Sequence, residues 1–549
     1  MPGIAAAAAL ALAAALVLQT PPAETPPARA PLTAEQLRAG GSVAGLEFTD
    51  AELALMLRGA SDSLRGYEAM WGVPLDNAVP PALRFSPLIP GVPARPEGVV
   101  APRFVLGEAE RPANLEDLAF ADIATLASLV KSKKVSAVEL TKMYVERLKR
   151  LDGKLSCVVT LMEKQALARA DELDRELASG LWRGFLHGIP YGAKDLLAAR
   201  GAPTTWGSVP FKEQVLDYDA TVVKKLDAAG AVLVAKLSLG ELAWGDVWFG
   251  GTTKNPWDLS DGSSGSSAGS ASATAAGAVA FAIGSETLGS IVSPSTKCGC
   301  SSLRPTFGRV SRHGAMALAW SMDKIGPICR SARDAAIVFQ EIAGPDGLDD
   351  SVIDLPYHLP GDVDVKGWKV GYLADAFESS ARDKQVLDDL RALGVELVPV
   401  KLPQYPLDAM VTILWAEAAA AFDELTRSGK DDLLVRQVDM AWPNVFRFAR
   451  LVPAVEYIRA NRIRTLLMRD MAKTMEGIEA YVHPSFAGGS LTLTNLTGHP
   501  TVVMPSGFNE RGTPFSISFT GQLFGETRLL ALAHAWQKST SHHLKHPKF

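Results

Sequence analysis

Two loops of small residues frame the middle of this chain: SSGSSAG at residues 263–269 and GSETLGSI at residues 284–291. The residues between them are almost all small or apolar, with Ala at every second or third position. A flexible Gly/Ser linker would not need this apolar content. The pattern predicts a buried helix that enters a short strand at residues 279–283, with one loop before the helix and one after the strand.

Loops of this composition can present backbone N–H groups to an anion. A phosphate group is one candidate, but phosphate-binding loops end in Lys-Ser or Lys-Thr, and neither loop does. The other candidate is the oxyanion that forms during acyl transfer.

The surrounding chain alternates helical and extended patterns. Residues 123–151 and 166–177 have helical periodicity, whereas residues 231–235, 370–373 and 396–400 are short apolar or β-branched runs. This alternation predicts a layered α/β architecture. We expect residues 368–400 to belong to the same large fold rather than to a separate domain.

The composition excludes several classes of protein. The chain has 549 residues, of which 47% are apolar and 21% charged, as in ordinary globular proteins. The formal net charge of −5 gives no indication of a nucleic-acid partner. Four Cys exclude a disulfide scaffold, and we expect all four to be buried small side chains.

The N-terminus carries an uncharged apolar run at residues 4–18, followed by a Pro-rich stretch. A membrane-spanning helix needs about 20 apolar residues, so this run is more typical of a secretory signal. We therefore predict residues 1–30 to be a signal peptide or disordered leader. The protein would then be periplasmic or secreted, with no stable membrane span after processing, and it would be cytoplasmic if the leader is not a signal. An uncleaved anchor is the remaining alternative.

A further motif stands upstream, GIPYGAKD at residues 188–195, and it contains Lys194. With this motif and the two Ser loops, the chain resembles the amidase signature family of Ser-cis-Ser-Lys hydrolases. The resemblance runs from about residue 120 to the C-terminus, and further matching motifs are NPW at 255–257, RPTFGR at 304–309, DKIGP at 323–327 and TGHP at 497–500. It implies an α/β amidase signature fold, with a large mixed twisted β-sheet covered on both faces by α-helices, in an amidase domain at residues 111–549.

The resemblance implies three catalytic residues. Ser290 aligns with the nucleophile, and the family places the cis-Ser 24 residues earlier, at Ser266 rather than at Ser263 or Ser264. Lys194 is the base. A Ser hydroxyl needs a base to become a nucleophile, and a Lys can be that base only if its pKa is lowered. Ser266 would relay the proton between Ser290 and Lys194 and return one to the leaving nitrogen.

Backbone N–H groups should form the oxyanion hole, and these belong to Thr287, Leu288, Gly289 and Ser290. Leu288 stands where the family more often has Gly, which keeps the donor but can change the loop. Ser285, Ser293 and Ser295 are rival nucleophiles, for which we favour local hydrogen bonds. We expect Asp195 to be structural. Five side chains are candidates either for a substrate pocket or for core packing: Trp244, Trp248, Phe249, Met316 and Trp320.

Residues 31–110 form the remaining part, a predicted N-terminal helical module with a Pro-rich linker. Thr33 with Gln36, and Thr49 with Glu52, have capping-box spacing. The module weakly resembles the small C subunit of aminoacyl-tRNA amidotransferases, and a generic helical hairpin is the alternative.

These observations predict hydrolysis of a small-molecule carboxylic amide, and also of an ester or carbamate, through a Ser290 acyl-enzyme. We expect no cofactor and no metal site. The alternatives are a glutamine-hydrolysing protein like the amidotransferase A subunit, or a non-catalytic binding protein on the same fold. The substrate and the oligomeric state stay open, with a homodimer among the options.

Overall fold

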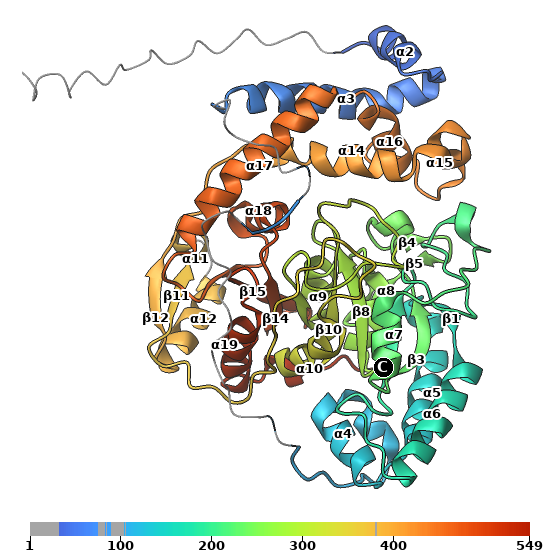
Figure 1. Ribbon diagram of the computed structural model, residues 1–549, viewed down its shortest axis with the longest axis vertical. Helices are drawn as coiled ribbons and strands as arrows, with labels where there is room; N and C mark the ends of the chain where they lie inside the picture. Colours follow the sequence, from blue (N-terminus) through green and yellow to red (C-terminus); the bar gives the residue numbers. More distant parts are fainter. Residues whose placement is uncertain (1–31, 75–82, 84, 89–103, 105, 379–380) are drawn as a thin grey trace, which may run out of the picture.

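An eleven-stranded sheet forms the centre of the computed structural model, which describes residues 32–74, 83, 85–88, 104, 106–378 and 381–549 (Figure 1). The strands lie in the order β1-β3-β2-β8-β10-β9-β14-β15-β13-β11-β12. Their bounds are β1 Val158–Leu161, β2 Pro190–Lys194, β3 Val232–Leu237, β8 Phe281–Glu286, β9 Ser301–Arg304, β10 Lys324–Cys329, β11 Lys369–Tyr372, β12 Glu396–Pro399, β13 Ala480–Pro484, β14 Thr501–Phe508 and β15 Pro514–Gly521.

The sheet is mixed, as the sequence predicts. Strand β2 is parallel to both β3 and β8, and β11 is parallel to β12 and β13. Strands β8, β10, β9, β14 and β15 pair antiparallel in that order. Two small two-stranded sheets, β4 Val247–Trp248 with β5 Gly251–Thr252 and β6 Lys254–Asn255 with β7 Asp258–Gly262, lie outside it.

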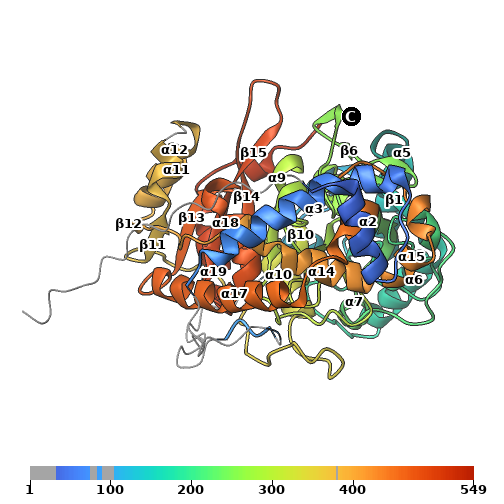
Figure 2. The same ribbon diagram turned by 90° about the horizontal axis from the view of Figure 1, so that it is seen from above.

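Helices cover both faces of the sheet. Viewed from above, α5 Ala137–Leu155 and α9 Val292–Cys298 lie on one side, and α7 Thr221–Ala228, α10 Ala332–Ile342 and α19 Glu526–Lys538 lie on the other (Figure 2). Helix α8 Ala268–Ala275 contacts α5 and α9. Other helices on or beside the sheet are α4 Ile123–Lys131, α6 Glu163–Ala178, α11 Ala374–Glu378, α12 Ala381–Ala392 and α18 Ser490–Thr497.

Small residues let α8 approach its neighbours closely. A Cβ at Gly269 would lie 2.5 Å from the carbonyl oxygen of Cys157 and 2.6 Å from the backbone nitrogen of Ser238, so only Gly fits there. The helix ends at Ala275, and Gly277 then takes a left-handed conformation (φ +64°). The strand that follows is β8 at Phe281–Glu286, slightly later than the predicted residues 279–283.

The long helical pattern of residues 123–151 is two helices in the structure, α4 and α5. They separate because Lys133 has a positive φ of 59° and Ser136 caps α5 with a complete capping box to Glu139. The other predicted helices and strands lie close to the residues predicted for them. Strands β11 and β12 are parallel and belong to the main sheet, so this segment is part of the same large fold, as predicted. All four Cys are buried and free.

A second layer of helices lies above one end of the core in Figure 1. It consists of α2 Ala34–Val43, α3 Asp50–Trp71, α13 Leu407–Met410, α14 Thr412–Ala421, α15 Asp423–Arg427, α16 Trp442–Ala449 and α17 Ala454–Thr474. Both predicted capping boxes, at Thr33 and Thr49, are present.

Helix α3 packs against α13, α16 and α17, so the N-terminal helices lie on the rest of the fold. Arg447 of α16 pairs with Glu52 of α3 at 3.0 Å and with buried Asp431 at 2.9 Å. A Cβ at Gly59 would lie 2.3 Å from the ring of Phe448, which shows how closely α3 approaches α16. The resemblance of these helices to an amidotransferase C subunit stays a prediction.

The predicted leader at residues 1–30 and most of the Pro-rich linker lie outside the described residues. In the part of the chain that is described, no helix has both the length and the apolar character that a membrane span requires.

Candidate active site

Lys194 is the last residue of β2, an interior strand of the sheet with β3 on one side and β8 on the other. Its side chain is fully buried. The Nζ atom donates hydrogen bonds to the hydroxyl oxygens of Ser266 at 2.8 Å, Ser267 at 3.1 Å and Ser285 at 2.9 Å. The buried amine at the end of this strand therefore contacts hydroxyl groups of both loops, residues 263–269 and residues 284–291.

The pKa of Lys194 is lowered from 10.5 to about 7. Burial is the main cause, because the charged form loses its hydration, and the negative charges of Asp323 and Glu286 only partly oppose it. A substantial fraction of Lys194 is therefore neutral near pH 7 and able to accept a proton.

The first loop brings Ser266 to Lys194. The Gly265–Ser266 peptide bond is cis, and a Cβ at Gly265 would lie 1.8 Å from the carbonyl oxygen of Gly245, so this position requires Gly. Ser263 and Ser264 are directed elsewhere: the Ser263 hydroxyl donates to the Ser264 carbonyl oxygen, and the Ser264 N–H donates to Asp246. Of these three serines, Ser266 is the one whose hydroxyl lies within hydrogen-bond distance of Lys194.

The second loop carries Ser290, which is buried, with 8% of its surface exposed. The N–H of Ser267 donates to the Ser290 carbonyl oxygen at 3.1 Å, which ties the two loops together. In the described part of the chain, the N–H groups of Thr287, Leu288, Gly289 and Ser290 donate to no protein acceptor. Four consecutive unpaired donors at one loop can receive an oxyanion.

Glu286 holds this loop in place through hydrogen bonds and an ion pair. Its carboxylate accepts the N–H groups of Ile291 at 2.8 Å and Val292 at 2.9 Å, and it pairs with Arg304 at 2.8 Å. Burial opposes ionisation of Glu286, but the positive charge of Arg304 and these hydrogen bonds outweigh it and lower the pKa to about 2. The carboxylate is therefore ionised at neutral pH and holds the residues that follow Ser290.

Thr287 connects the same loop to the next segment of the chain. Its hydroxyl donates to Asp323 at 2.6 Å, and the other oxygen of Asp323 accepts the N–H groups of Leu318 at 2.8 Å and Ala319 at 3.0 Å. A cavity of about 290 Å³ opens here, lined in part by Ser285, Thr287, Met316 and Trp320.

Of the five side chains considered for a pocket, Met316 and Trp320 line this cavity. Trp248 is 6% exposed and packs beside Gly250, and Trp244 lies under the guanidinium of Arg436 at 4.1 Å. Core packing therefore accounts for part of this group, as the alternative interpretation expects.

Asp195 has the structural role that the sequence suggests. It forms a fully buried ion pair with Lys236 of β3 at 2.7 Å and accepts the N–H of Thr205 at 2.9 Å. Burial lowers the pKa of Lys236, and the charge of Asp195 opposes that shift. A second buried lysine thus lies beside Lys194 on the neighbouring strand, but with a carboxylate partner.

Sequence reasoning missed the roles of three residues of this site. Ser267 and Ser285 both contact Lys194, and Asp323 supports Thr287. The sequence indicates Ser285 only as a rival nucleophile. The parallel pairing of β2 with β8, which brings Ser285 beside Lys194, is a long-range contact with no local sequence signal.

In the described residues, no group of three or more His, Cys, Asp or Glu side chains is arranged to hold a metal ion.

Comparison with known proteins gives one consistent result. Residues 139–493 match the Amidase family. The chain is 33% identical over 474 residues to the A subunit of glutamyl-tRNA(Gln) amidotransferase from Moorella thermoacetica, covering 77% of this chain and 97% of that protein. It is also 33% identical over 480 residues to the corresponding protein of Acaryochloris marina, covering 78% of this chain and all of that protein.

Solved structures agree with these matches. The peptide amidase from Stenotrophomonas maltophilia superposes with a TM-score of 0.70 and 29% identity, covering 79% of this chain and 99% of that chain. The A subunit of glutamyl-tRNA(Gln) amidotransferase from Thermotoga maritima gives a TM-score of 0.62 and 26% identity, covering 78% and 96%. With its fold, its lysine strand and its two Ser loops, this chain belongs to the amidase signature family.

Proposed function

We propose that this protein hydrolyses a carboxylic amide through an acyl-enzyme at Ser290, with Ser266 and Lys194 as the proton relay. The observation that carries the proposal is the hydrogen bond of 2.8 Å from buried Lys194 to Ser266. A buried amine with a pKa of about 7 is suited to act as a general base at neutral pH.

In the first step, the Ser290 oxygen attacks the amide carbon. The Ser290 proton passes to Ser266, whose own proton passes to neutral Lys194. The carbonyl oxygen becomes an oxyanion, which the free N–H groups of Thr287, Leu288, Gly289 and Ser290 stabilise.

The C–N bond then breaks, and the relay runs in reverse to protonate the leaving nitrogen. This return of a proton matters because an unprotonated amine is a very poor leaving group. Water next attacks the acyl-enzyme and gives up a proton to the same relay. The bond from the acyl carbon to the Ser290 oxygen then breaks, the relay returns the proton to that oxygen, and the carboxylic acid is released. Esters and carbamates would pass through the same acyl-enzyme.

The decisive experiment is covalent labelling with a serine-directed fluorophosphonate. Wild-type protein should be labelled on Ser290 and should hydrolyse amides, whereas Ser290→Ala should do neither. Ser293→Ala is the matched control, because Ser293 lies on the next helix, and it should keep both properties. Equal labelling of Ser290→Ala and wild type would refute Ser290 as the nucleophile. A wild type that is neither labelled nor active on amides would leave the non-catalytic alternative.

The second candidate is a glutamine-hydrolysing protein, which the names of the amidotransferase relatives suggest. It predicts hydrolysis of L-glutamine and little activity on other amides. A panel that sets L-glutamine against simple aliphatic and aryl amides separates the two, because a general amidase should turn over the panel without a preference for glutamine.

We also propose that the apolar run at residues 4–18 directs export. N-terminal sequencing of the protein from its native host should then give a mature start between about residues 20 and 32, and a cytosolic protein that begins at Met1 would contradict this. A homodimer stays a prediction that light scattering of the purified protein can test.

A further inference from the structure

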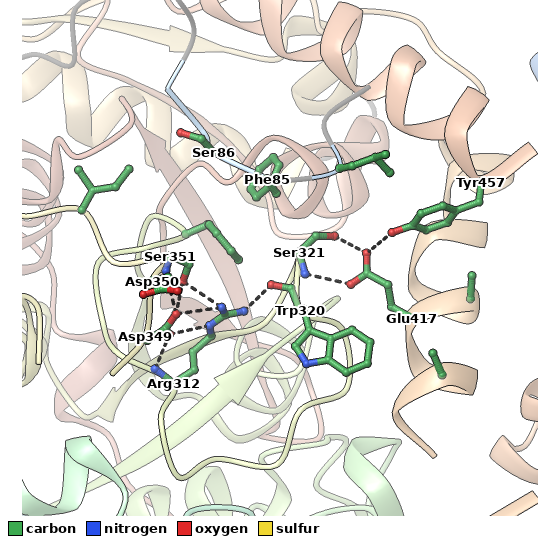
Figure 3. Close-up of a pocket in the computed structure, with 15 residues that line it drawn as sticks. Phe85, Ser86, Arg312, Trp320, Ser321, Asp349, Asp350, Ser351, Glu417 and Tyr457 are labelled. Carbon is green, nitrogen blue, oxygen red and sulfur yellow. Dashed lines mark hydrogen bonds and ion pairs between the residues drawn. The ribbon is translucent and has the colours of Figure 1, made fainter. Parts of the chain in front are cut away.

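A second cavity, of about 810 Å³, adjoins the cavity beside Thr287. Figure 3 shows the side chains that line the second cavity. The two share four lining residues: Arg312, Trp320, Asp349 and Asp350. The second cavity extends to Glu417 of α14 and Tyr457 of α17. Its volume lies in the range that holds small-molecule ligands. The two cavities therefore border each other at these four side chains.

Aromatic side chains supply much of its wall. Phe85 is almost fully buried, its ring centroid lies 4.8 Å from that of Phe307, and the guanidinium of Arg464 lies 3.6 Å from its ring centre. Phe85 precedes residues 139–493, the part that matches the Amidase family. The N-terminal part of this chain thus adds a wall of its own to the cavity.

Trp320 differs from these rings because it is 51% exposed although it borders both cavities. A large indole surface left open at this junction is available to a ligand. Figure 3 shows Trp320 between the group of Arg312, Asp349, Asp350 and Ser351 and the pair of Glu417 and Tyr457.

The charges on the lining favour a positive ligand over a negative one. Arg312 is already engaged by Asp349, through bonds of 3.0 Å and 3.2 Å, and it also donates to Ser351 at 2.9 Å. Glu417 accepts hydrogen bonds from Ser321 and Tyr457. Neither Glu417 nor Asp350 forms an ion pair in the described part of the chain, and Asp350 is the exposed one of the two, so its carboxylate is accessible to a cation.

We propose that this second cavity binds the part of the amide substrate that is remote from the scissile bond, and that this part is an aryl or long apolar group carrying a positive charge. Trp320 stacks on the apolar portion, and Asp350 pairs with the charge. Trp320 and Asp350 are then specificity-determining residues. This inference rests on the proposed amide hydrolysis and adds the class of substrate.

Four primary amides test it: a short aliphatic amide, and three aryl-alkyl amides of equal length that end in an ammonium, a hydroxymethyl or a carboxylate group. The value of kcat/KM should be highest for the ammonium ending and lowest for the carboxylate. Trp320→Ala should lower kcat/KM about tenfold for the three long amides, from loss of an aromatic contact, and by clearly less for the short one, because Trp320 also borders the cavity beside Thr287. Trp320→Phe should retain most of the activity.

Asp350→Asn should reduce the preference for the ammonium over the carboxylate ending by up to about fivefold, the effect of a solvent-accessible ion pair. Asp354→Asn is the matched control, since Asp354 is exposed and does not line the cavity, and it should leave the preference unchanged.

The possible failures are distinguishable. If the short amide is hydrolysed in a Ser290-dependent way but Trp320→Ala lowers all four substrates equally, or if Asp350→Asn leaves the charge preference intact, the inference about the cavity is wrong and the proposed hydrolysis stands. If none of the four amides is hydrolysed, the proposed function and this inference fall together.

Discussion

The Nζ atom of Lys194 lies 2.8 Å from the hydroxyl oxygen of Ser266, and in the described residues no carboxylate lies within ion-pair distance of it. Lys236, on the neighbouring strand, is equally buried but pairs with Asp195 at 2.7 Å. A buried carboxylate partner favours the charged form of an amine, whereas hydroxyl neighbours do so weakly. This difference makes Lys194 better suited than Lys236 to the proposed proton transfer.

The acid limb of the pH profile should report Lys194. Below a pH of about 7 the amine is protonated and has no free electron pair for the Ser266 proton, so kcat/KM should fall as the pH decreases through that value. Lys194→Ala should lose amide hydrolysis by at least ~10²-fold, and ester hydrolysis by less, because an alcohol leaves with less help from an acid. An acid limb near pH 10, or a fully active Lys194→Ala, would exclude the lysine as the base.

Ser285 should influence the pH at which this acid limb of the kcat/KM profile falls. Its hydroxyl accepts a hydrogen bond from Lys194 at 2.9 Å, which favours the charged amine. Ser285→Ala should therefore lower the pKa of Lys194 further and move the acid limb to lower pH. Ser285→Thr keeps the hydroxyl and should leave the limb near its wild-type position. A limb that is unchanged in Ser285→Ala would show that this contact has no influence on the base.

The three serines of the first loop should differ sharply in steady-state kinetics. Ser266→Ala should reduce amide turnover by ~10²–10⁴-fold, the usual cost of removing a positioned acid–base group. Ser263→Ala and Ser264→Ala should have mild effects, because neither hydroxyl contacts Lys194. Similar small losses in all three variants would refute the assignment of Ser266.

Thr287→Val should lower kcat and change KM little. The substitution keeps the N–H group but removes the hydrogen bond of 2.6 Å to Asp323 that positions it. We expect a loss smaller than the ~10²–10³-fold cost of removing an oxyanion donor altogether. Thr287→Ser retains the hydroxyl and should restore the rate, whereas equally slow Ser and Val variants would point to a different role for this side chain.

Glu286→Gln should destabilise the protein at neutral pH by about 3–5 kcal/mol, because it leaves the buried guanidinium of Arg304 without its anion. The Glu286 pKa is about 2, below its unfolded value of ~4.3, so the stabilisation is fully present above that unfolded value and is lost as the pH falls towards 2. The difference in Tm between the two proteins should shrink over that interval. Glu510→Gln, at an exposed turn, is the control and should match wild type throughout.

The sequence by itself determined the fold class and the order of the motifs. Local patterns were sufficient for this, since the Ala-rich segment, the capping boxes at Thr33 and Thr49 and the β-branched runs each depend on neighbouring residues. The resemblance to a known family then singled out Lys194, Ser266 and Ser290. The sequence does not predict the break between α4 and α5, because Lys133 adopts a positive φ and lysine is not a residue type that favours this conformation.

Only the tertiary structure decided what surrounds those residues. Lys194 loses its hydration because β2 lies between β3 and β8, and Ser285 reaches it through that same pairing, between residues far apart in sequence. The second cavity likewise combines Phe85, Trp320 and Tyr457 from three distant segments. A pKa and a pocket depend on burial and on neighbours in space, and a linear pattern contains neither.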